Sequence, residues 1–286
     1  MISVTPSGQG CGATVTGVDL ASDLDATTVK EIRNAWLTHH VLVFPDQELD
    51  DIALESFAET IGPIGADPFF GTIADDKRIA AVSRRADETG PVFAEVWHSD
   101  WSFLETPPAG TCLYGITIPP SGGDTLFLNE QRALEEMPEP LRTKLEAKTA
   151  LHSARRAYAP DGKYAPDKYK GSMDIRPSEE ALAVFSHPLI RKHPETGRPG
   201  LFAGSYVFAF EETSDDEAAD ILDELNAWMT QPAFQYRHKW QEGMLVLWDN
   251  RCVLHKATGG YEGYDRLLHR LTIADDPTYY LPSDGL

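Results

Sequence analysis

Cysteine is scarce in this sequence, and long apolar runs are absent. The three cysteines, Cys11, Cys112 and Cys252, are odd in number and show no CxxC spacing. This pattern excludes a disulfide framework and a zinc knuckle, and it predicts reduced thiols in a cytoplasmic protein. The N-terminus lacks the basic start and apolar segment of a secretory signal. No apolar run approaches the ~20 residues of a membrane span, so we expect no membrane partner.

Basic residues are also in short supply. The chain has 25 Lys and Arg against 45 Asp and Glu, which gives a formal net charge of −20. A field of this sign repels phosphate backbones, so we expect no nucleic-acid partner. No GxGxxG or Walker loop follows a predicted strand, which removes the main support for a nucleotide-binding fold. An anionic substrate would therefore need a local cationic pocket.

The overall composition is that of an ordinary globular protein. Hydrophobic residues make up 42% and charged residues 24% of the 286 residues. We therefore predict a single domain over residues 1–286 with its own core. Three amphipathic helices are expected: one capped by Asp25, one that stops at Gly62, and one that begins with a capping box at Ser214 and stops before Pro232. A helical segment over 131–148 is interrupted by prolines.

Short β-type runs separate these helices and outnumber them. They cover residues 41–44, 78–83, 111–118, 125–128, 185–192, 201–203, 234–240, 244–248 and 268–273. Many short strands with a few outer helices predict an α+β, mainly β fold, either a sandwich or a jelly roll. The segment at about 156–180 has little periodicity. It is either a lid over a site or a disordered insertion.

The clearest chemical motif is WHSD at residues 97–100. If this segment is a strand, His98 and Asp100 point to the same face. A second histidine, His255, follows the strand at 244–248. Two imidazoles and one carboxylate on one side of an iron leave three coordination positions open, as in non-haem Fe(II) oxygenases. The HxD pattern alone is weak, because roughly one such pair arises by chance and a histidine in the core explains it equally well.

A wider set of motifs resembles the taurine dioxygenase / 2,4-D dioxygenase family of Fe(II)- and 2-oxoglutarate-dependent enzymes. The matching blocks are GATVTGVDL (12–20), VLVFPDQ (41–47), WHSD (97–100), GGDT (122–125) and LWDNR (247–251), followed by His255, Arg266 and Arg270. The resemblance covers nearly the whole chain. It implies a double-stranded β-helix (jelly roll) with flanking helices. It also implies iron ligation by His98, Asp100 and His255, O₂ and 2-oxoglutarate as co-substrates, and a homo-oligomer, either dimer or tetramer.

Chemistry independent of the family supports a co-substrate site. A 2-oxo acid that chelates iron through its C1 carboxylate and keto oxygen leaves its distal carboxylate to be held elsewhere, and arginine suits that task. Arg266 lies eleven residues after His255. The resemblance implies that Arg266 binds the C5 carboxylate with help from Thr125. The alternatives are a surface salt bridge for Arg266 and an ordinary strand hydroxyl for Thr125.

Arg270 follows four residues later and shares a face with Arg266 if the segment is a strand. The resemblance implies that Arg270 contacts the anionic head of the substrate; pairing with a carboxylate of the chain is the alternative. Where taurine-oxidising members have a histidine, a tyrosine and an asparagine, this chain has Asp67, Phe70 and Ala94. A carboxylate would repel a sulfonate, so we expect a substrate other than taurine, unless Asp67 pairs with the cation of a zwitterion.

Aromatic residues near these positions suggest the shape of the substrate. Phe70 and Trp101 could form an apolar wall for a bulky organic acid, although core packing explains each one separately. His152, Arg155 and Arg156 form a small basic cluster, which we interpret as solvated surface.

The predicted function is hydroxylation, and cleavage where the product collapses, of a small anionic organic substrate. Carboxylates, sulfonates, sulfate esters and aryloxy acids are the candidate classes. Two alternatives remain open: a metal-dependent hydrolase or isomerase, which would need a general base near its metal, and a non-catalytic jelly-roll binding protein, which would tolerate loss of a metal ligand.

Overall fold

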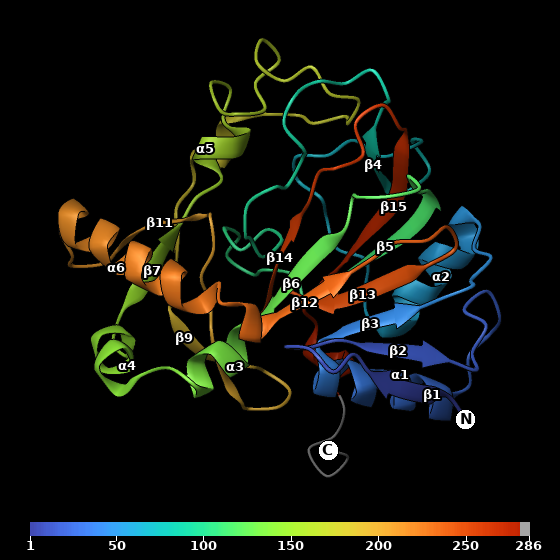
Figure 1. Cartoon of the computed structure of the whole chain (residues 1–286), viewed down its shortest axis with the longest axis horizontal. Helices are drawn as coiled ribbons and strands as arrows, with labels where there is room; N and C mark the ends of the chain where they lie inside the picture. The colour runs from blue at the N-terminus through green and yellow to red at the C-terminus, as the bar shows by residue number, and fades with distance from the viewer. Residues whose placement is uncertain (281–286) are drawn as a thin grey trace.

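The computed structural model describes residues 1–280, and its largest element is a seven-stranded mixed sheet (Figure 1). The strand order is β1-β2-β3-β13-β5-β15-β4, with β2 and β3 parallel and the other neighbours antiparallel. The strands are β1 (Ser3–Pro6), β2 (Ala13–Thr16), β3 (Val41–Phe44), β4 (Ala80–Arg84), β5 (Gly110–Thr117), β13 (Leu245–Asp249) and β15 (Arg266–Ile273).

A smaller antiparallel sheet faces the large one and carries the inner side of the core. Its order is β12-β6-β14, formed by β6 (Thr125–Asn129), β12 (Gln235–His238) and β14 (Val253–Ala257). Val43, Leu113 and Trp248 of the large sheet share one buried cluster with Phe127 and Val253 of the small sheet. The strands of both sheets are therefore buried where they face each other, as in a sandwich.

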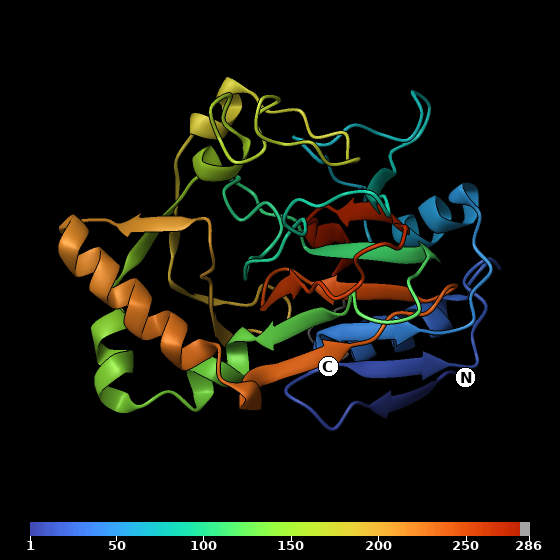
Figure 2. The same cartoon turned by 45° about the horizontal axis from the view of Figure 1, so that its top comes forward.

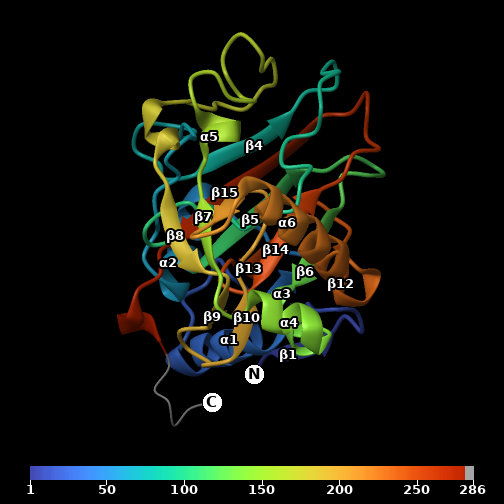
Figure 3. The ribbon, with the colours of Figure 1, turned by 90° about the vertical axis from the view of Figure 1, so that its left-hand side faces the viewer.

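Two helices cover the other face of the large sheet. They are α1 (Ala26–His39) and α2 (Asp51–Ile61). Their apolar stripes pack against the residues of β3 and β13 that point away from the small sheet. The side chain of Asp25 accepts a hydrogen bond from the backbone N–H of Thr28, and Asp50 caps α2 in the same way. Figure 3 shows both helices on the side away from the small sheet. The predicted start of α1 and the predicted stop of α2 at Gly62 are confirmed.

The remaining elements form a second lobe at the left of Figure 1. It contains α3 (Glu130–Glu135), α4 (Glu139–Leu145), α6 (Asp215–Met229), the sheet β11-β7-β8 and the pair β10-β9. The five strands are β7 (Thr149–His152), β8 (Phe185–Pro188), β9 (Ile190–Lys192), β10 (Pro199–Leu201) and β11 (Val207–Phe210). The segment at 131–148 is interrupted at Pro138, between α3 and α4, whereas Pro140 lies in the first turn of α4. Within the described residues, no helix combines the length and apolarity needed to cross a bilayer.

The segment at 156–180 packs against the body of the protein. It contains the end of α5 (Arg155–Tyr158) and leads into the 3₁₀ helix at Glu179–Leu182; two further 3₁₀ turns are Pro232–Phe234 and Pro277–Tyr279. Tyr158, Tyr164 and Met173 are buried in one cluster with Phe69 and Trp101. Figure 2 shows this segment at the top of the molecule, beside the loop that follows β4.

Candidate metal centre and active site

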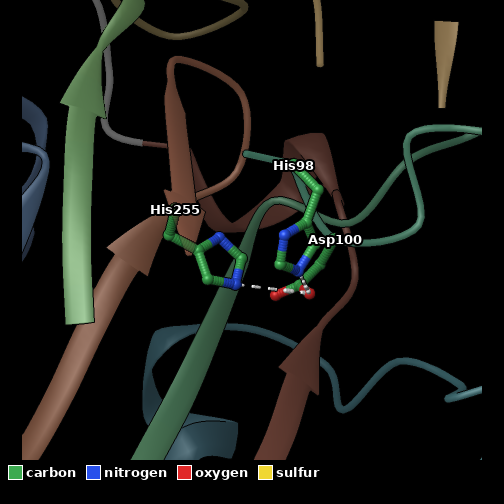
Figure 4. A group of neighbouring side chains, drawn as sticks. All are labelled: His98, Asp100 and His255. Carbon is green, nitrogen blue, oxygen red and sulfur yellow. Dashed lines mark ion pairs between the residues drawn. The ribbon is translucent and has the colours of Figure 1, made fainter. Parts of the chain in front are cut away.

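Three side chains from distant parts of the chain converge at one end of the two sheets (Figure 4). The Nε2 atoms of His98 and His255 lie 3.8 and 3.7 Å from the same oxygen, Oδ1 of Asp100. All three side chains are buried. Their ligand atoms all lie within 4.8 Å of one another, a spacing that can hold a metal ion. The structure thus brings together the three residues that the sequence predicts as metal ligands; their ligation of a metal stays a prediction.

Backbone pairing holds the two histidines together. His98 N–H donates to His255 O at 3.0 Å, and His255 N–H donates to His98 O at 2.8 Å. His98 therefore attaches to β14 as an isolated bridge. The expectation of a strand around WHSD was wrong: Asp100 lies in a turn, and Trp101 has a left-handed φ of 49°. The indole N–H of Trp101 bonds to Asp67 at 2.6 Å, which helps hold this uncommon backbone conformation.

Further polar side chains orient Asp100. Its Oδ2 accepts a 2.7 Å hydrogen bond from the Thr111 hydroxyl, which in turn accepts one from the Asn250 amide at 2.9 Å. The side-chain oxygen of Asn250, Oδ1, accepts a hydrogen bond from the indole N–H of Trp248 at 2.9 Å. These supporting partners were missed from sequence. Such outer contacts fix the direction of a ligand and so influence metal affinity.

The charge states of the triad suit a divalent cation. Burial lowers the pKa of His98, and burial together with His98 lowers the pKa of His255 to about 3. Burial alone would raise the pKa of Asp100, but the Arg270 guanidinium and the two imidazoles outweigh it and lower that pKa. The site thus presents neutral imidazoles and a carboxylate at neutral pH. His98 Nδ1 lies 2.8 Å from Val96 O, which leaves Nε2 as its ligand atom.

A cavity opens beside the triad, and Arg266 lines it together with both histidines. The Arg266 side chain is buried and donates through Nη2 to Gly123 O at 3.1 Å. Its Nε has no partner among the described residues, and burial lowers the pKa of its guanidinium. A buried cation without a carboxylate is costly, so this cavity fits an anionic ligand. Thr125 also lines the cavity, with its hydroxyl 2.9 Å from the Trp240 indole nitrogen.

Glycines bring the two sides of this cavity together. Gly122 and Gly123 have φ values of 74° and 66°, a region that glycine enters without strain. A Cβ at Gly122 would lie 2.2 Å from Gly260 O, so the two turns can approach this closely only without a side chain at Gly122. Their contact places Thr125 beside Arg266.

Arg270 lies on the same face of β15 but has different surroundings. Its Nε and Nη2 lie 3.3 and 3.2 Å from Asp67 Oδ1, and its Nη1 lies 3.0 Å from Asp100 Oδ1. The guanidinium also lies over the rings of Phe70 and Trp101, at 5.5 and 5.2 Å from their centroids. The expected contact of Arg270 with a substrate stays a prediction, whereas its pairing with carboxylates of the chain is present.

Asp67, Phe70 and Trp101 lie behind Arg270. None of the three lines the two cavities that border His98. The second of these cavities is walled instead by Phe93, Tyr158, Tyr164 and Tyr206. This wall was missed from sequence; the tyrosines of 156–180, which include Tyr158 and Tyr164, were the signal that could have indicated part of it.

A second buried group, His193, Asp249 and Cys252, also has metal-like spacing. Arg251 binds both carboxylate oxygens of Asp249, at 2.8 and 2.7 Å, and His193 Nε2 lies 3.0 Å from one of them. Burial raises the pKa of the Cys252 thiol well above its ordinary value. This cluster therefore stabilises a buried arginine.

Comparison with known proteins agrees with this geometry. A family model for the taurine catabolism dioxygenase TauD, TfdA family matches residues 3–272. The alkylsulfatase of Acinetobacter baylyi is 32% identical over 278 residues, 93% of this chain and 83% of that protein. The alpha-ketoglutarate-dependent 2,4-dichlorophenoxyacetate dioxygenase of Cupriavidus pinatubonensis is 32% identical over 280 residues, 92% and 94% of the two chains.

The fold leads to the same relatives. The crystal structure of a taurine dioxygenase from Burkholderia xenovorans matches with a TM-score of 0.78 and 30% identity, over 96% of this chain and 91% of that one. The family match spans both sheets and every residue of the triad. The chain therefore belongs to the TauD/TfdA family, and it is a 2-oxoglutarate-dependent dioxygenase.

Proposed function

We propose that His98, Asp100 and His255 bind Fe(II), and that Arg266 and Thr125 bind 2-oxoglutarate. One observation carries this proposal: the guanidinium of Arg266 is buried without a carboxylate partner among residues 1–280, in the cavity that both imidazoles also line. A hydrolase that uses the same triad would have no use for such a cation. A double-stranded β-helix arrangement of the two facing sheets is part of the same proposal.

Each group of the chain has a distinct task in this reaction. Bound iron would supply the activation of O₂ that is coupled to decarboxylation of 2-oxoglutarate to succinate and CO₂. His98, Asp100 and His255 would hold the metal and, as only three ligands, would leave further coordination positions to the co-substrates. Arg266 fixes the distal end of the 2-oxo acid, and the wall of Phe93 and neighbouring tyrosines keeps water from the reacting carbon. No general base is required of the protein.

The substrate that we propose is a small organic anion other than taurine. Asp67 occupies the place where a sulfonate would have to approach Arg270, and its carboxylate already pairs with that guanidinium. Relatives named for alkyl sulfates and for 2,4-dichlorophenoxyacetate support sulfate esters and aryloxy acids as the classes to test first.

Three further proposals concern the molecule as a whole. We propose that 156–180 acts as a lid within a single domain, because its tyrosines wall the second cavity. We propose a cytoplasmic enzyme, because Cys11, Cys112 and Cys252 are all free and buried. We also propose a homo-oligomer, a dimer or a tetramer, by analogy with the family.

Succinate formation from 2-oxoglutarate tests the function. The purified protein with Fe(II), ascorbate and O₂ is given alkyl sulfates, aryloxy acids, sulfonates and amino acids in turn. We expect turnover that depends on one of the first two classes and weak turnover with taurine. Strong taurine-dependent turnover would overturn our interpretation of Asp67. Consumption of one of these substrates in the absence of 2-oxoglutarate would instead favour a hydrolase.

A ligand variant tests the metal assignment separately. Anaerobic addition of Fe(II) and 2-oxoglutarate should produce a visible charge-transfer band, and His255→Ala should abolish it. His269→Ala is the matched control, because His269 lies on β15 in the other sheet with its Nδ1 2.9 Å from Asp51. A normal band in His255→Ala would refute the ligand assignment.

A further inference from the structure

We propose that Arg156 in the 156–180 segment, rather than Arg270, binds the anionic group of the prime substrate. The inference rests on the proposed function and names a specificity residue for it. It assigns a cationic group to the second cavity beside His98. It also changes the interpretation of Arg156, which the sequence alone indicated to be solvated surface.

Arg270 is poorly suited to a second anion because its charge is already matched within the chain. Asp67 accepts from Nε and Nη2, Asp100 accepts from Nη1, and Thr272 Oγ1 lies 3.1 Å from Nη2. The Thr272 hydroxyl in turn donates to Asp67 at 2.6 Å. Side chains of Phe70 and Trp101 lie near the guanidinium. Asp100 is assigned to the metal in the proposed function, but the Asp67 carboxylate alone already matches the charge of this guanidinium, so an added anion would have to displace it.

Arg156, unlike Arg270, has a charge that no carboxylate of the described residues matches. It is exposed at the surface, and within residues 1–280 its guanidinium has no carboxylate at ion-pair distance. It lines the second cavity together with His98, and it also lines both hollows that adjoin this cavity on the outside. The other cation of the cavity, Lys163, is already paired with Glu95 at 3.0 Å. Arg156 is therefore the unpaired positive charge at the junction between solvent and the triad.

The wall between Arg156 and His98 is mainly aromatic. Phe93 and Tyr164 lie 5.3 Å apart between ring centroids, and Tyr158 and Tyr164 lie 5.4 Å apart. Burial raises the pKa of Tyr164 to about 12, so this ring adds no negative charge. Such a passage suits a flat or apolar body that extends from the metal toward the mouth. The geometry points to an aryl- or alkyl-bearing acid whose anion lies at the Arg156 end.

Paired ligands test this assignment by binding, without reliance on turnover. Phenoxyacetate is compared with neutral phenoxyacetamide, and hexyl sulfate with hexanol, by calorimetry on the anaerobic enzyme with Fe(II) and 2-oxoglutarate. We expect the wild type to prefer an anion over its neutral counterpart at least about tenfold, the range of one charged hydrogen bond. Arg156→Gln should remove most of this preference, and Arg156→Lys should restore part of it.

Arg155→Gln is the matched control, because Arg155 is the adjacent exposed residue of α5 and does not line the second cavity. Its anion preference should equal that of the wild type. A preference that survives Arg156→Gln, or a wild type that prefers no anion of either pair, overturns the proposal. Loss of the iron and 2-oxoglutarate band in wild type would instead contradict the proposed function, so the two failures are distinguishable.

A second variant tests the role of Asp67 in the same scheme. Asp67→Asn removes one of the carboxylates from Arg270 and should strengthen binding of ethanesulfonate, a short anion, by about tenfold or more. Ethanesulfonate binding to wild type that is as tight as that of phenoxyacetate would contradict a neutralised Arg270. Ethanesulfonate binding that is equally tight in Asp67→Asn and wild type would also contradict a neutralised Arg270.

Discussion

At the scale of single residues, Arg266 and Arg270 share a strand face but have different surroundings. Arg270 contacts two carboxylates, whereas Arg266 contacts a backbone carbonyl and two aromatic rings, Tyr261 and Trp240. An arginine that already has carboxylate partners supports structure, and one that lacks them is available to a ligand. The same criterion distinguishes Arg156 from Lys163.

Substitution of Arg266 by Gln should raise the half-saturating concentration of 2-oxoglutarate steeply. Loss of one side of a buried charge pair costs about 2–5 kcal/mol, which corresponds to roughly 30- to 4,000-fold. Succinate formation across a titration of 2-oxoglutarate measures the change. Arg85→Gln, which removes an exposed arginine paired with Asp87, serves as control. An unchanged requirement for 2-oxoglutarate would exclude Arg266 from the co-substrate site.

Thr111→Val should weaken Fe(II) binding by about 10- to 100-fold, because it removes the hydrogen bond that orients Asp100. Thr111→Ser keeps the hydroxyl and should retain most of the affinity. The affinity for Fe(II) is measured by following the charge-transfer band as Fe(II) is added in the presence of 2-oxoglutarate. Equal affinities in the Val and Ser variants would mean that the hydroxyl does not orient the ligand.

Glu130 should make stability depend on pH. Burial raises its pKa from 4.5 to about 8, and its Oε2 has no partner among residues 1–280. Between these pH values the folded state keeps a proton that the unfolded state has lost. The stabilisation is therefore complete below about pH 4.5 and is lost as pH rises through 8, by up to ~1.4 kcal/mol per pH unit.

Urea unfolding of wild type and Glu130→Gln at several pH values isolates this contribution from that of the buried histidines. The variant should gain stability relative to wild type as pH rises from about 5 to 8. Glu136→Gln, at an exposed ion pair, should not. A constant difference between Glu130→Gln and wild type would show that Glu130 does not titrate in this range.

Single residues also define the limit of sequence-based prediction for the site. His98, Asp100 and His255 could be identified because their spacing belongs to a recognisable set of motifs. The role of Asp67 could not, because its partner Arg270 lies 203 positions away and only the folded chain brings the two together. Thr111 and Asn250 were missed for the same reason: a hydroxyl and an amide acquire their meaning from their neighbours.

At the scale of elements, α6 shows how a local motif meets tertiary contacts. Ser214 Oγ accepts from the backbone N–H of Glu217, as a capping box requires. In the full motif the Glu217 carboxylate would accept from the backbone N–H of Ser214. Here it instead accepts from Lys148 Nζ at 3.2 Å. The helix therefore begins at the predicted residue with half of the predicted motif.

Ser214→Ala should lower the free energy of unfolding by about 1 kcal/mol, the usual value of an N-cap. Glu217→Gln should change it by only a few tenths, because an exposed ion pair contributes little. Denaturant unfolding of the two variants compares them. A larger effect of Glu217→Gln than of Ser214→Ala would show that the ion pair outweighs the cap.

The prediction of strands was uneven. The range of β3 agrees with its prediction residue for residue, because VLVF is fully buried. By contrast, β14 was missed: its sequence VLHKA contains His255, the proposed ligand, and a lysine, which break the apolar pattern. The short strands β1, β2, β7 and β11 were missed as well, because strands of four residues carry little periodicity.

At the scale of the whole molecule, the net charge of −20 contrasts with the arginines that line the cavities. Self-repulsion of the excess carboxylates opposes the compact state, and salt screens it. Added KCl from about 0.01 to 0.2 M should therefore raise the urea midpoint of unfolding. A midpoint that falls over this range would show that local ion pairs dominate over the net charge.

The backbone pairing of His98 with His255 has a consequence for how the protein is made. During synthesis, the first imidazole emerges from the ribosome long before the strand that anchors it. Until His255 has been translated, the growing chain carries only His98 and Asp100 of the three proposed donors. We therefore expect the growing chain to bind iron weakly before β14 has formed.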